Sequence, residues 1–335
     1  MALEDVKKEY AKIVAVVKTL QDTLDISYFD ALIETADNLA AGEVHVEDGQ
    51  PSEEVQHQLL ERYQKIHLDS FSRDEARQLL QLLILNAYRE ERVQANHQMT
   101  PDTVGILVEY VIEKIIPHKD LQILDIAVGT GNLLMTVVNR LQTVSDHQIT
   151  AYGVDNDDTQ LALAGVMAEW GQAPVELIHQ DAISQLMVPQ TDLVIGDLPV
   201  GYYPIDERTA TYETRESAGH SYVHYLMIEQ ALRNLVPGGW GVFIVPVNLF
   251  SDEHAQRLLE YIKEVGYLQG MLGLPADLFQ TEVARKAVLI IQKQGGNAKQ
   301  APQILLGDFP SFKDKEEFHK FLNSITQWER QSFTK

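Results

Sequence analysis

Apolar side chains in residues 1–98 recur every three or four positions, which is the spacing of one face of an α-helix. The first of these stripes consists of Val6, Tyr10, Ile13, Val17, Leu20 and Leu24. Further stripes follow, and Ser72 and Glu75 form a capping-box pattern ahead of the last one. We therefore predict that residues 1–98 form a domain made of helices only, a domain type that indicates no particular function.

The first stripe has two interpretations. It can pack against neighbouring helices of its own chain, which is the usual role of an apolar helix face. It is also long enough, at about three heptads, to form the seam of a homodimer. The sequence leaves both open, so a homodimer through the N-terminal helices is one expectation for the partners of this protein.

From residue 121 onwards, short apolar runs alternate with segments of helical spacing. Buried strands are predicted at residues 121–127, 149–154, 175–178, 192–195 and 240–245. Such alternation is typical of a parallel sheet that is covered on both faces. Two further runs, at residues 267–272 and 287–291, are connected too closely for a helical crossover, so one of them should be antiparallel.

These elements predict an α/β fold class, with a Rossmann-like, seven-stranded, mostly parallel sheet and an N-terminal all-α domain. Gly295 and Gly296 mark the end of the sheet domain. The expected organisation is a helical domain at 1–98, a sheet domain at 99–296 and a C-terminal appendage at 297–335. Residues 204–221 are expected to form a flexible flap beside the fourth strand.

The chain carries 27 basic and 49 acidic side chains, a formal net charge of −22, and no cysteine. The lack of cysteine excludes thiolate nucleophiles, disulfides and zinc–thiolate sites, and no metal is expected. The acidic charge repels phosphate backbones, so a role on nucleic acid must overcome it. A charged first segment and the lack of 18 consecutive apolar residues predict a cytoplasmic protein without a secretory signal or membrane span.

Two glycines, Gly129 and Gly131, follow the first predicted strand and precede a predicted helix. Glycine lets the backbone turn sharply and approach a ligand at the carboxyl edge of the sheet, where open α/β sheets bind ligands. A nicotinamide dinucleotide requires a third glycine, but that position is Leu134. The pattern therefore indicates a different nucleoside ligand.

An aspartate ends or follows each of the first four predicted strands; these are Asp125, Asp155, Asp181 and Asp197. Asp155 is placed to accept both hydroxyls of a ribose, although an ordinary loop acid is the alternative because Asp157 and Asp158 follow closely. Four carboxylates favour a positively charged ligand over a pyrophosphate. An uncharged ribose joined to a cationic sulfonium fits this edge best.

Together these motifs resemble a class I S-adenosylmethionine-dependent methyltransferase of the adenine-specific DNA methylase branch, which is related to the modification subunits of restriction systems. The matching segments within residues 98–293 are 98–101, 125–132, 235–248 and 274–279. The resemblance implies S-adenosyl-L-methionine as cofactor, with Thr100 and Pro101 closing over its methionine part and Asp181 reading its adenine amino group. It assigns to the cofactor Thr100, Pro101, Asp125, Ala127, Gly129, Gly131, Asn132, Asp155, Asn156, Asp181, Ala182 and Asp197.

The catalytic motif departs from the family pattern of Asp or Asn, two prolines and an aromatic residue. Residues 197–200 read Asp-Leu-Pro-Val. The resemblance assigns Asp197 and Pro199 to the catalytic motif, where the acid side chain and a neighbouring carbonyl accept the hydrogens of a target amino group. Leu198 restores a backbone N–H that proline lacks, and Val200 cannot stack on a base.

Two tyrosines follow the motif directly. Tyr202 or Tyr203 can supply the missing ring from a displaced position, and both are therefore included among the candidate catalytic residues. The alternative is that they are loop tyrosines that cover apolar surface. The sequence does not decide between these roles.

Three functions are compatible with these residues. The first is methyl transfer to an amino group, such as that of adenine in DNA. The second is methyl transfer to a substrate other than nucleic acid, and the third is a catalytically weakened cofactor-binding protein with an interaction or regulatory role. The sequence beyond residue 296 is too short for a target-recognition domain, so we expect DNA recognition to need a separate partner.

Overall fold

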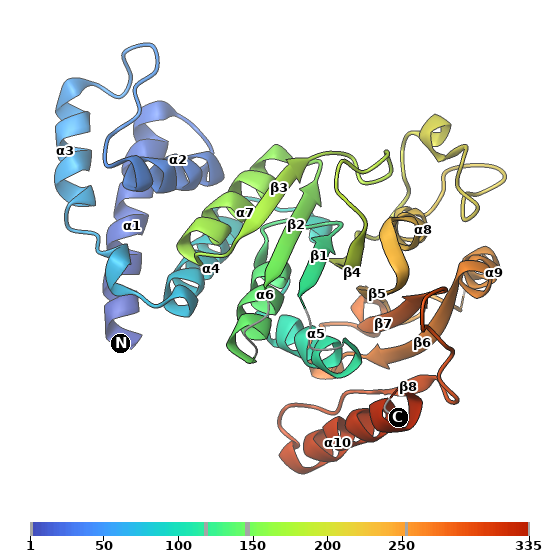
Figure 1. The fold of residues 1–335 in the computed structure, drawn as a ribbon. Helices are drawn as coiled ribbons and strands as arrows, with labels where there is room; N and C mark the ends of the chain where they lie inside the picture. The colour runs from blue at the N-terminus through green and yellow to red at the C-terminus, as the bar shows by residue number, and fades with distance from the viewer. Residues whose placement is uncertain (1–2, 117–119, 145–147, 252–253, 334–335) are drawn as a thin grey trace. The chain divides into compact units, whose positions relative to one another are not determined.

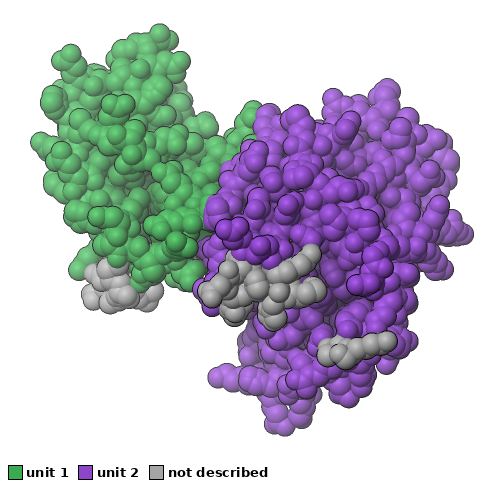
Figure 2. Space-filling view, viewed as in Figure 1, with its two compact units in different colours: residues 1–98, 129–131, 157–173 green, residues 99–128, 132–156, 174–335 purple. Residues whose placement is uncertain are grey.

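The computed structural model describes residues 3–116, 120–144, 148–251 and 254–333. The chain divides into two units (Figure 2). Unit 1 comprises residues 1–98, 129–131 and 157–173, and unit 2 comprises residues 99–128, 132–156 and 174–335. Among the described residues, no helix has the length and hydropathy needed to cross a bilayer.

Unit 1 consists of helices, as the apolar stripes predict. They are α1 (Leu3–Leu24), α2 (Tyr28–Ala41), α3 (Glu53–Tyr63), α4 (Arg73–Glu90) and α7 (Asp158–Trp170), with the short turns η1 (Leu68–Ser70) and η2 (Ala95–His97). The capping box at the start of α4 is confirmed, because Ser72 accepts from the backbone of Glu75 and the Glu75 carboxylate accepts in return. These reciprocal bonds satisfy donors that a helix leaves unpaired at its first turn.

The first apolar stripe packs within unit 1. Val6, Ile13, Val17 and Leu20 on α1 are buried, and α1 contacts α2, α3 and α4. Burial against its own chain is sufficient to explain the stripe. A homodimer through these helices stays a prediction.

Helix α7 lies between two strands in the sequence but packs with the helical unit. It contacts α2 and α4, and the Arg73 guanidinium donates to the side-chain oxygen of Gln172 at 3.3 Å. From the sequence, this segment is expected in the sheet domain, because the order of elements along the chain places it between two strands and does not reveal its packing partners.

Unit 2 is built on a single eight-stranded sheet in the order β3-β2-β1-β4-β5-β7-β6-β8 (Figure 1). Its strands are β1 (Leu121–Asp125), β2 (Ile149–Asp155), β3 (Val175–His179), β4 (Thr191–Asp197), β5 (Leu235–Pro246), β6 (Gly266–Gly273), β7 (Lys286–Lys293) and β8 (Leu305–Asp308). All neighbouring pairs are parallel except those of β7, which is antiparallel to β5 and β6. This confirms the expectation of one antiparallel strand among the last two runs.

The sheet has one strand more than predicted. The additional strand, β8, lies in the expected C-terminal appendage and pairs in parallel with β6 at the edge of the sheet. It is only four residues long, and only Leu305 among them is buried. Such a short edge strand has no readable alternation of apolar and polar residues.

Helices cover both faces of this sheet, as predicted. They are α5 (Asp102–Ile115), α6 (Asn132–Val144), α8 (Val223–Asn234), α9 (Ala255–Val265) and α10 (Lys315–Ser332). Figure 1 shows α5 and α6 on one side and α8 and α9 on the other. Helix α5 starts directly after the Thr-Pro segment, so its placement fixes the position of that segment.

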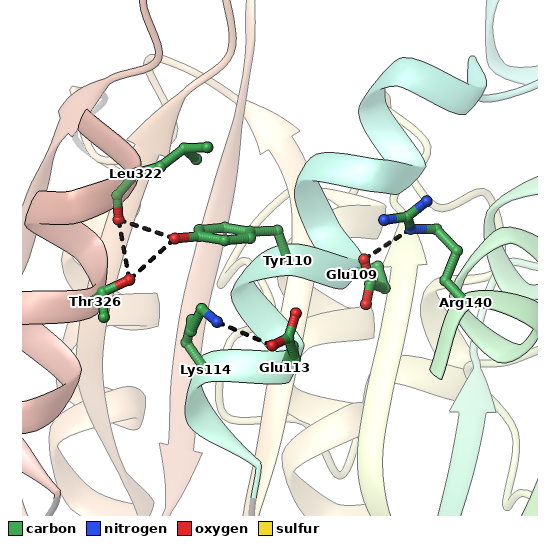
Figure 3. Close-up of polar contacts among 7 residues, drawn as sticks. All are labelled: Glu109, Tyr110, Glu113, Lys114, Arg140, Leu322 and Thr326. Atoms are coloured by element: carbon green, nitrogen blue, oxygen red, sulfur yellow. Dashed lines mark hydrogen bonds and ion pairs between the residues drawn. The ribbon is translucent and has the colours of Figure 1, made fainter. Parts of the chain in front are cut away.

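Helix α5 is held by polar contacts on two sides (Figure 3). The Tyr110 hydroxyl donates to the carbonyl of Leu322 on α10 at 2.9 Å, and Arg140 on α6 donates to the carboxylate of Glu109 at 2.8 Å. The Glu109 side chain is almost fully buried, so its ion pair with Arg140 satisfies a charge that burial would otherwise penalise. The C-terminal helix thereby belongs to the same packed unit as the sheet.

Candidate active site

Four aspartates follow one another along the carboxyl edge of the sheet. They are Asp125 at the end of β1, Asp155 at the end of β2, Asp181 just after β3 and Asp197 at the end of β4. The strand order β3-β2-β1-β4 and the parallel pairing place these strand ends side by side. All four lie in unit 2. The structure therefore brings the sequence-predicted acids to the edge where open α/β sheets bind ligands.

Asp125 is fully buried at this edge. Its Oδ1 accepts the backbone N–H of Ala127 at 3.1 Å, whereas its Oδ2 has no hydrogen-bond partner in the described part of the chain. Burial, together with the negative charges of Asp155 and Asp197, raises the pKa of Asp125 to about 8. At neutral pH this carboxyl is therefore uncharged, and a positive charge brought near it by a ligand would favour its ionised form.

Asp197 has donors on both of its oxygens. The Thr100 hydroxyl donates to Oδ2 at 2.9 Å, and the Lys286 ammonium donates to Oδ1 at 2.6 Å. The Asp197 side chain is 19% exposed and that of Lys286 is 32% exposed. The carboxylate predicted to accept a target amine therefore already binds an amine of its own chain.

Thr100 is positioned by the start of α6. The Asn132 side-chain amide donates to the Thr100 carbonyl at 2.7 Å and to the Asp102 carboxylate at 3.0 Å. Pro101 is the N-cap residue of α5, where its missing N–H costs nothing. Three of the predicted cofactor residues, Thr100, Pro101 and Asn132, thus form one local arrangement that reaches Asp197.

The residue after Asp197 shows what the altered motif does to the backbone. The N–H of Leu198 donates to the carbonyl of Ile244 at 3.0 Å, and the Leu198 side chain is fully buried. A proline at this position cannot make that bond. The expected backbone donor is therefore used to extend the pairing of β4 with β5, while Pro199 is half-buried and Val200 is exposed.

Asp181 also has partners within the chain. Its Oδ2 accepts from the Tyr203 hydroxyl and from the Arg208 guanidinium, both at 2.6 Å, and its Oδ1 accepts the N–H of Ile183 at 2.9 Å. Burial raises the pKa of Tyr203 to about 12, with a further contribution from Asp181, so Tyr203 stays protonated and donates. Ala182, also among the predicted cofactor residues, is buried in the hydrophobic core of unit 2.

The two tyrosines of the candidate catalytic set differ in exposure. Tyr203 is 6% exposed, whereas Tyr202 is 61% exposed and stacks on Tyr222 with ring centroids 4.8 Å apart. Tyr222 also meets the ring of His254 edge-on at 5.5 Å. Of the two, Tyr202 is the one that presents a ring to solvent.

The segment between Tyr203 and Tyr222 is anchored to helix α8 in its middle part. The Glu229 carboxylate on α8 accepts the backbone N–H groups of Glu213 and Thr214, and Tyr212 is buried with its hydroxyl on Gln230. These contacts hold the middle of residues 204–221 against α8. The expectation of a flexible flap is therefore not supported for residues 212–214.

The remaining predicted cofactor residues are Gly129, Gly131 and Asn156. Gly129 and Gly131 have φ angles of +50° and +81°, which residues with a side chain rarely adopt, so the local backbone explains why glycines stand there. Both belong to unit 1, and the site described here is confined to unit 2. The Asn156 carbonyl contacts the ring of His179 at 3.1 Å.

Sequence reasoning missed Lys286, Arg208 and Tyr222. Lys286 is the first residue of an antiparallel strand, and it is 89 positions from Asp197 in the sequence. No local sequence motif predicts an ion pair of this kind, because the two residues come together only through the order of the strands in the sheet. Arg208 lies in the segment expected to be a flap, and Tyr222 follows that segment directly; the sequence did not predict the path of the chain there.

Comparison with known proteins identifies the class. The family model described as N-6 DNA Methylase matches residues 82–335, and the model described as the YtxK N-terminal helical domain matches residues 8–88. The first match covers more than half of the chain, so the protein belongs to the N-6 DNA methylase family. The match reaches further in both directions than the resemblance read from the motifs.

Individual relatives agree with this assignment. The protein YtxK of Bacillus subtilis (strain 168) is 35% identical over 315 residues, covering 92% of this chain and 93% of YtxK. A solved Listeria monocytogenes structure, assigned to the class I S-adenosylmethionine-dependent methyltransferases, is 39% identical with a TM-score of 0.90 and covers 98% of this chain and 100% of its own. S-adenosyl-L-methionine is the methyl donor of this class, which confirms the expected cofactor.

A more distant structure shares the fold. It is a modification subunit assigned to a type I restriction enzyme of Vibrio vulnificus YJ016, with 17% identity, a TM-score of 0.59, and coverage of 82% of this chain and 61% of that one. This likeness shows that the chain has the α/β fold of such subunits.

Proposed function

We propose that this protein transfers a methyl group from S-adenosyl-L-methionine to the exocyclic amino group of a nucleobase, with adenine in DNA as the first acceptor to test. The observation that supports this most directly is the environment of Asp197. A carboxylate at the end of β4 accepts an N–H of Lys286 at 2.6 Å, so an oxygen at this position is able to accept the hydrogens of an amino group. An acceptor amine placed there would have its hydrogens held by Asp197 and its lone pair directed away from the carboxylate.

The residues around Asp125 support the cofactor assignment. The cofactor carries positive charge and supplies an electrophilic methyl group when bound. Asp125 offers a buried oxygen without a hydrogen-bond partner in the described part of the chain, and we propose that Asp155, at the end of the next strand, accepts the ribose hydroxyls. Thr100 and Pro101, fixed by Asn132, would cover the methionine part.

The exposed ring of Tyr202 is evidence for a flat, aromatic acceptor. Its ring lies five positions after Asp197 in the sequence, is largely exposed and is backed by Tyr222. Stacking on an aromatic side chain is how proteins hold an unstacked base. We propose that Tyr202 takes the stacking role that Val200 cannot fill, while Tyr203 positions Asp181 from the buried side, and that the carbonyl beside Pro199 shares in holding the amine.

Recognition of a DNA sequence would require a partner. The net charge of −22 opposes phosphate binding, and modification subunits of restriction systems share this fold. We propose that a separate basic subunit supplies the phosphate contacts.

The test is methyl transfer from labelled cofactor by the full chain to a single-stranded oligonucleotide with one adenine. Asp197→Ala should lower the rate by at least about 100-fold, because the amine is no longer oriented toward the methyl group. Asp37→Ala, which removes an exposed acid on α2, is the matched control and should leave the rate unchanged. Full activity of Asp197→Ala would exclude Asp197 from the reaction.

Stacking is tested separately with Tyr202→Ala and Tyr202→Phe. Alanine should weaken binding of the oligonucleotide by about 1–3 kcal/mol, the usual value of stacking one base, whereas phenylalanine should retain it. Equal affinities of the two variants would rule out a stacking role for Tyr202.

The ion pair between Asp197 and Lys286 also supports a second function, that of a cofactor-binding protein without methyl transfer. Because Lys286 and Thr100 both donate to Asp197, the site is satisfied without an acceptor, as expected of a cofactor-binding protein whose role is interaction or regulation. Tight binding of S-adenosyl-L-methionine with no transfer to nucleic acid, protein or small-molecule amines would establish this alternative.

A further inference from the structure

Of the two groups that donate to Asp197, Lys286 is the more exposed. Thr100, on the other oxygen, is 9% exposed, whereas the Lys286 side chain is 32% exposed. Lys286 also begins β7 beside Pro246 of β5, so its backbone is fixed by sheet pairing while its four-carbon side chain can move. Of the two donors on Asp197, the ammonium of Lys286 is therefore the one that is more accessible and can move away.

An ammonium and an exocyclic amine place the same atoms on a carboxylate, namely N–H groups. A carboxylate oxygen can accept two hydrogen bonds, but a nucleobase amine that approaches Oδ1 from the direction of Lys286 competes with its ammonium, which lies 2.6 Å away. The exchange is feasible because a partly exposed ion pair is weak and its lysine can rotate into water. When the ammonium of Lys286 is displaced, Asp197 loses the positive charge next to it, which is unfavourable.

The surrounding acids make that loss significant. Asp125 interacts with the charges of both Asp197 and Asp155, so removal of an ammonium leaves the edge more negative. A bound cationic cofactor supplies a replacement charge. Acceptor binding should therefore be favoured once the cofactor is in place.

We propose that Lys286 is a displaceable occupant of the acceptor position, which the amino group of the substrate must replace, and that it thereby sets the selectivity of the site for acceptors. This inference rests on the proposed function, because it takes Asp197 as the group that binds the acceptor amine. Lys286 acts through Asp197 and is a positioning residue.

The test measures binding rather than turnover. The full-length protein is saturated with an unreactive cofactor analogue that carries an ammonium in place of the sulfonium, so that the positive charge is kept without methyl transfer. The affinity is measured by fluorescence anisotropy for two nonamers of thymidine, one with a central adenine and one with a central purine that lacks the amino group. Lys286→Met should bind the adenine oligonucleotide about tenfold more tightly than the native chain, about 1.4 kcal/mol, with no gain for the purine oligonucleotide. Lys286→Arg, which retains a cation on Asp197, should show no gain.

The matched control is Lys299→Met, because it removes one positive charge from an exposed position of the same unit. A general electrostatic effect of lost charge would appear in both methionine variants and for both oligonucleotides. Equal affinity of Lys286→Met and the native chain for the adenine oligonucleotide would overturn the inference, as would an equal gain with the purine oligonucleotide.

A second measurement separates this inference from the proposed function. If no variant binds either oligonucleotide, binding of a nucleobase acceptor by this chain without a partner is ruled out. Lys286→Ala is then heated with and without propylammonium, with propanol as control. If propylammonium but not propanol raises the melting temperature, and the double variant Asp197→Asn/Lys286→Ala shows no such rise, Asp197 has an exchangeable binding position for an amine. The absence of any rise in melting temperature would overturn the inference.

Discussion

The acids of the carboxyl edge fall into two groups that differ in how their charge is balanced. The outer acids, Asp181 after β3 and Asp197 on β4, each hold a cation of the chain, Arg208 and Lys286 respectively. The inner acid Asp125 is fully buried, has one oxygen without a hydrogen-bond partner, and keeps its proton up to a pKa of about 8. The difference indicates that the chain balances the charge of the outer acids with its own cations and that of Asp125 with a proton, which a cationic ligand would displace.

The largest effect is expected at Asp155, on the strand next to Asp125. Asp155→Ala should weaken binding of S-adenosyl-L-methionine by about 3–6 kcal/mol, since it removes two charge-assisted bonds to ribose of about 1.5–3 kcal/mol each. Calorimetric titration measures the loss, and Asp157→Ala on the neighbouring loop is the control. Unchanged affinity would show that the ribose does not lie on β2.

The second effect concerns stability and pH. Because the pKa of Asp125 is raised from 3.8 to about 8, the folded chain holds a proton between these values that the unfolded chain has lost. The contribution of this group to the free energy of unfolding should therefore fall as pH rises from about 4 to about 8, with a limiting slope of about 1.4 kcal/mol per pH unit.

Urea denaturation at pH 5, 6 and 7 measures this slope against Asp125→Asn, which has no proton to lose. The stability of the native chain relative to the variant should decline across the series. A constant difference would contradict the assigned proton.

The third effect is a proton released on binding. A cationic ligand next to Asp125 favours its ionised form, so binding of S-adenosyl-L-methionine at pH 7 should release up to about one proton. Calorimetry in buffers of different ionisation enthalpy counts the protons, and Asp125→Asn should release none. Equal release by both chains would place the cation away from Asp125.

The smallest effect is expected at the outer acid Asp181. Tyr203→Phe removes the hydroxyl donated to Asp181 and should lower the free energy of unfolding by about 1 kcal/mol, because Arg208 still binds the carboxylate. Denaturant titration measures the change, with Tyr202→Phe on the exposed ring as control. A larger loss of cofactor affinity than of stability would show that Asp181 faces the ligand after all.

The elements of the sheet were predictable because strands buried on both faces produce apolar runs whose ends can be read. β1 and β4 end at the predicted acids, and the antiparallel partner was expected from a short connection. β8 was missed because four residues at an edge carry no periodic signal. Helix α7 was assigned to the sheet domain because its packing partners α2 and α4 are distant in the sequence.

The sequence by itself determined the α/β class, the positions of the four acids and the glycine turn, because these depend on local periodicity and on where a strand ends. The tertiary structure decided what each carboxylate binds. Lys286 is 89 positions from Asp197, and its ammonium reaches the carboxylate only because β7 pairs with β5 and β5 with β4. The protonation of Asp125 likewise arises from burial and from neighbouring charges, which are properties of the folded chain.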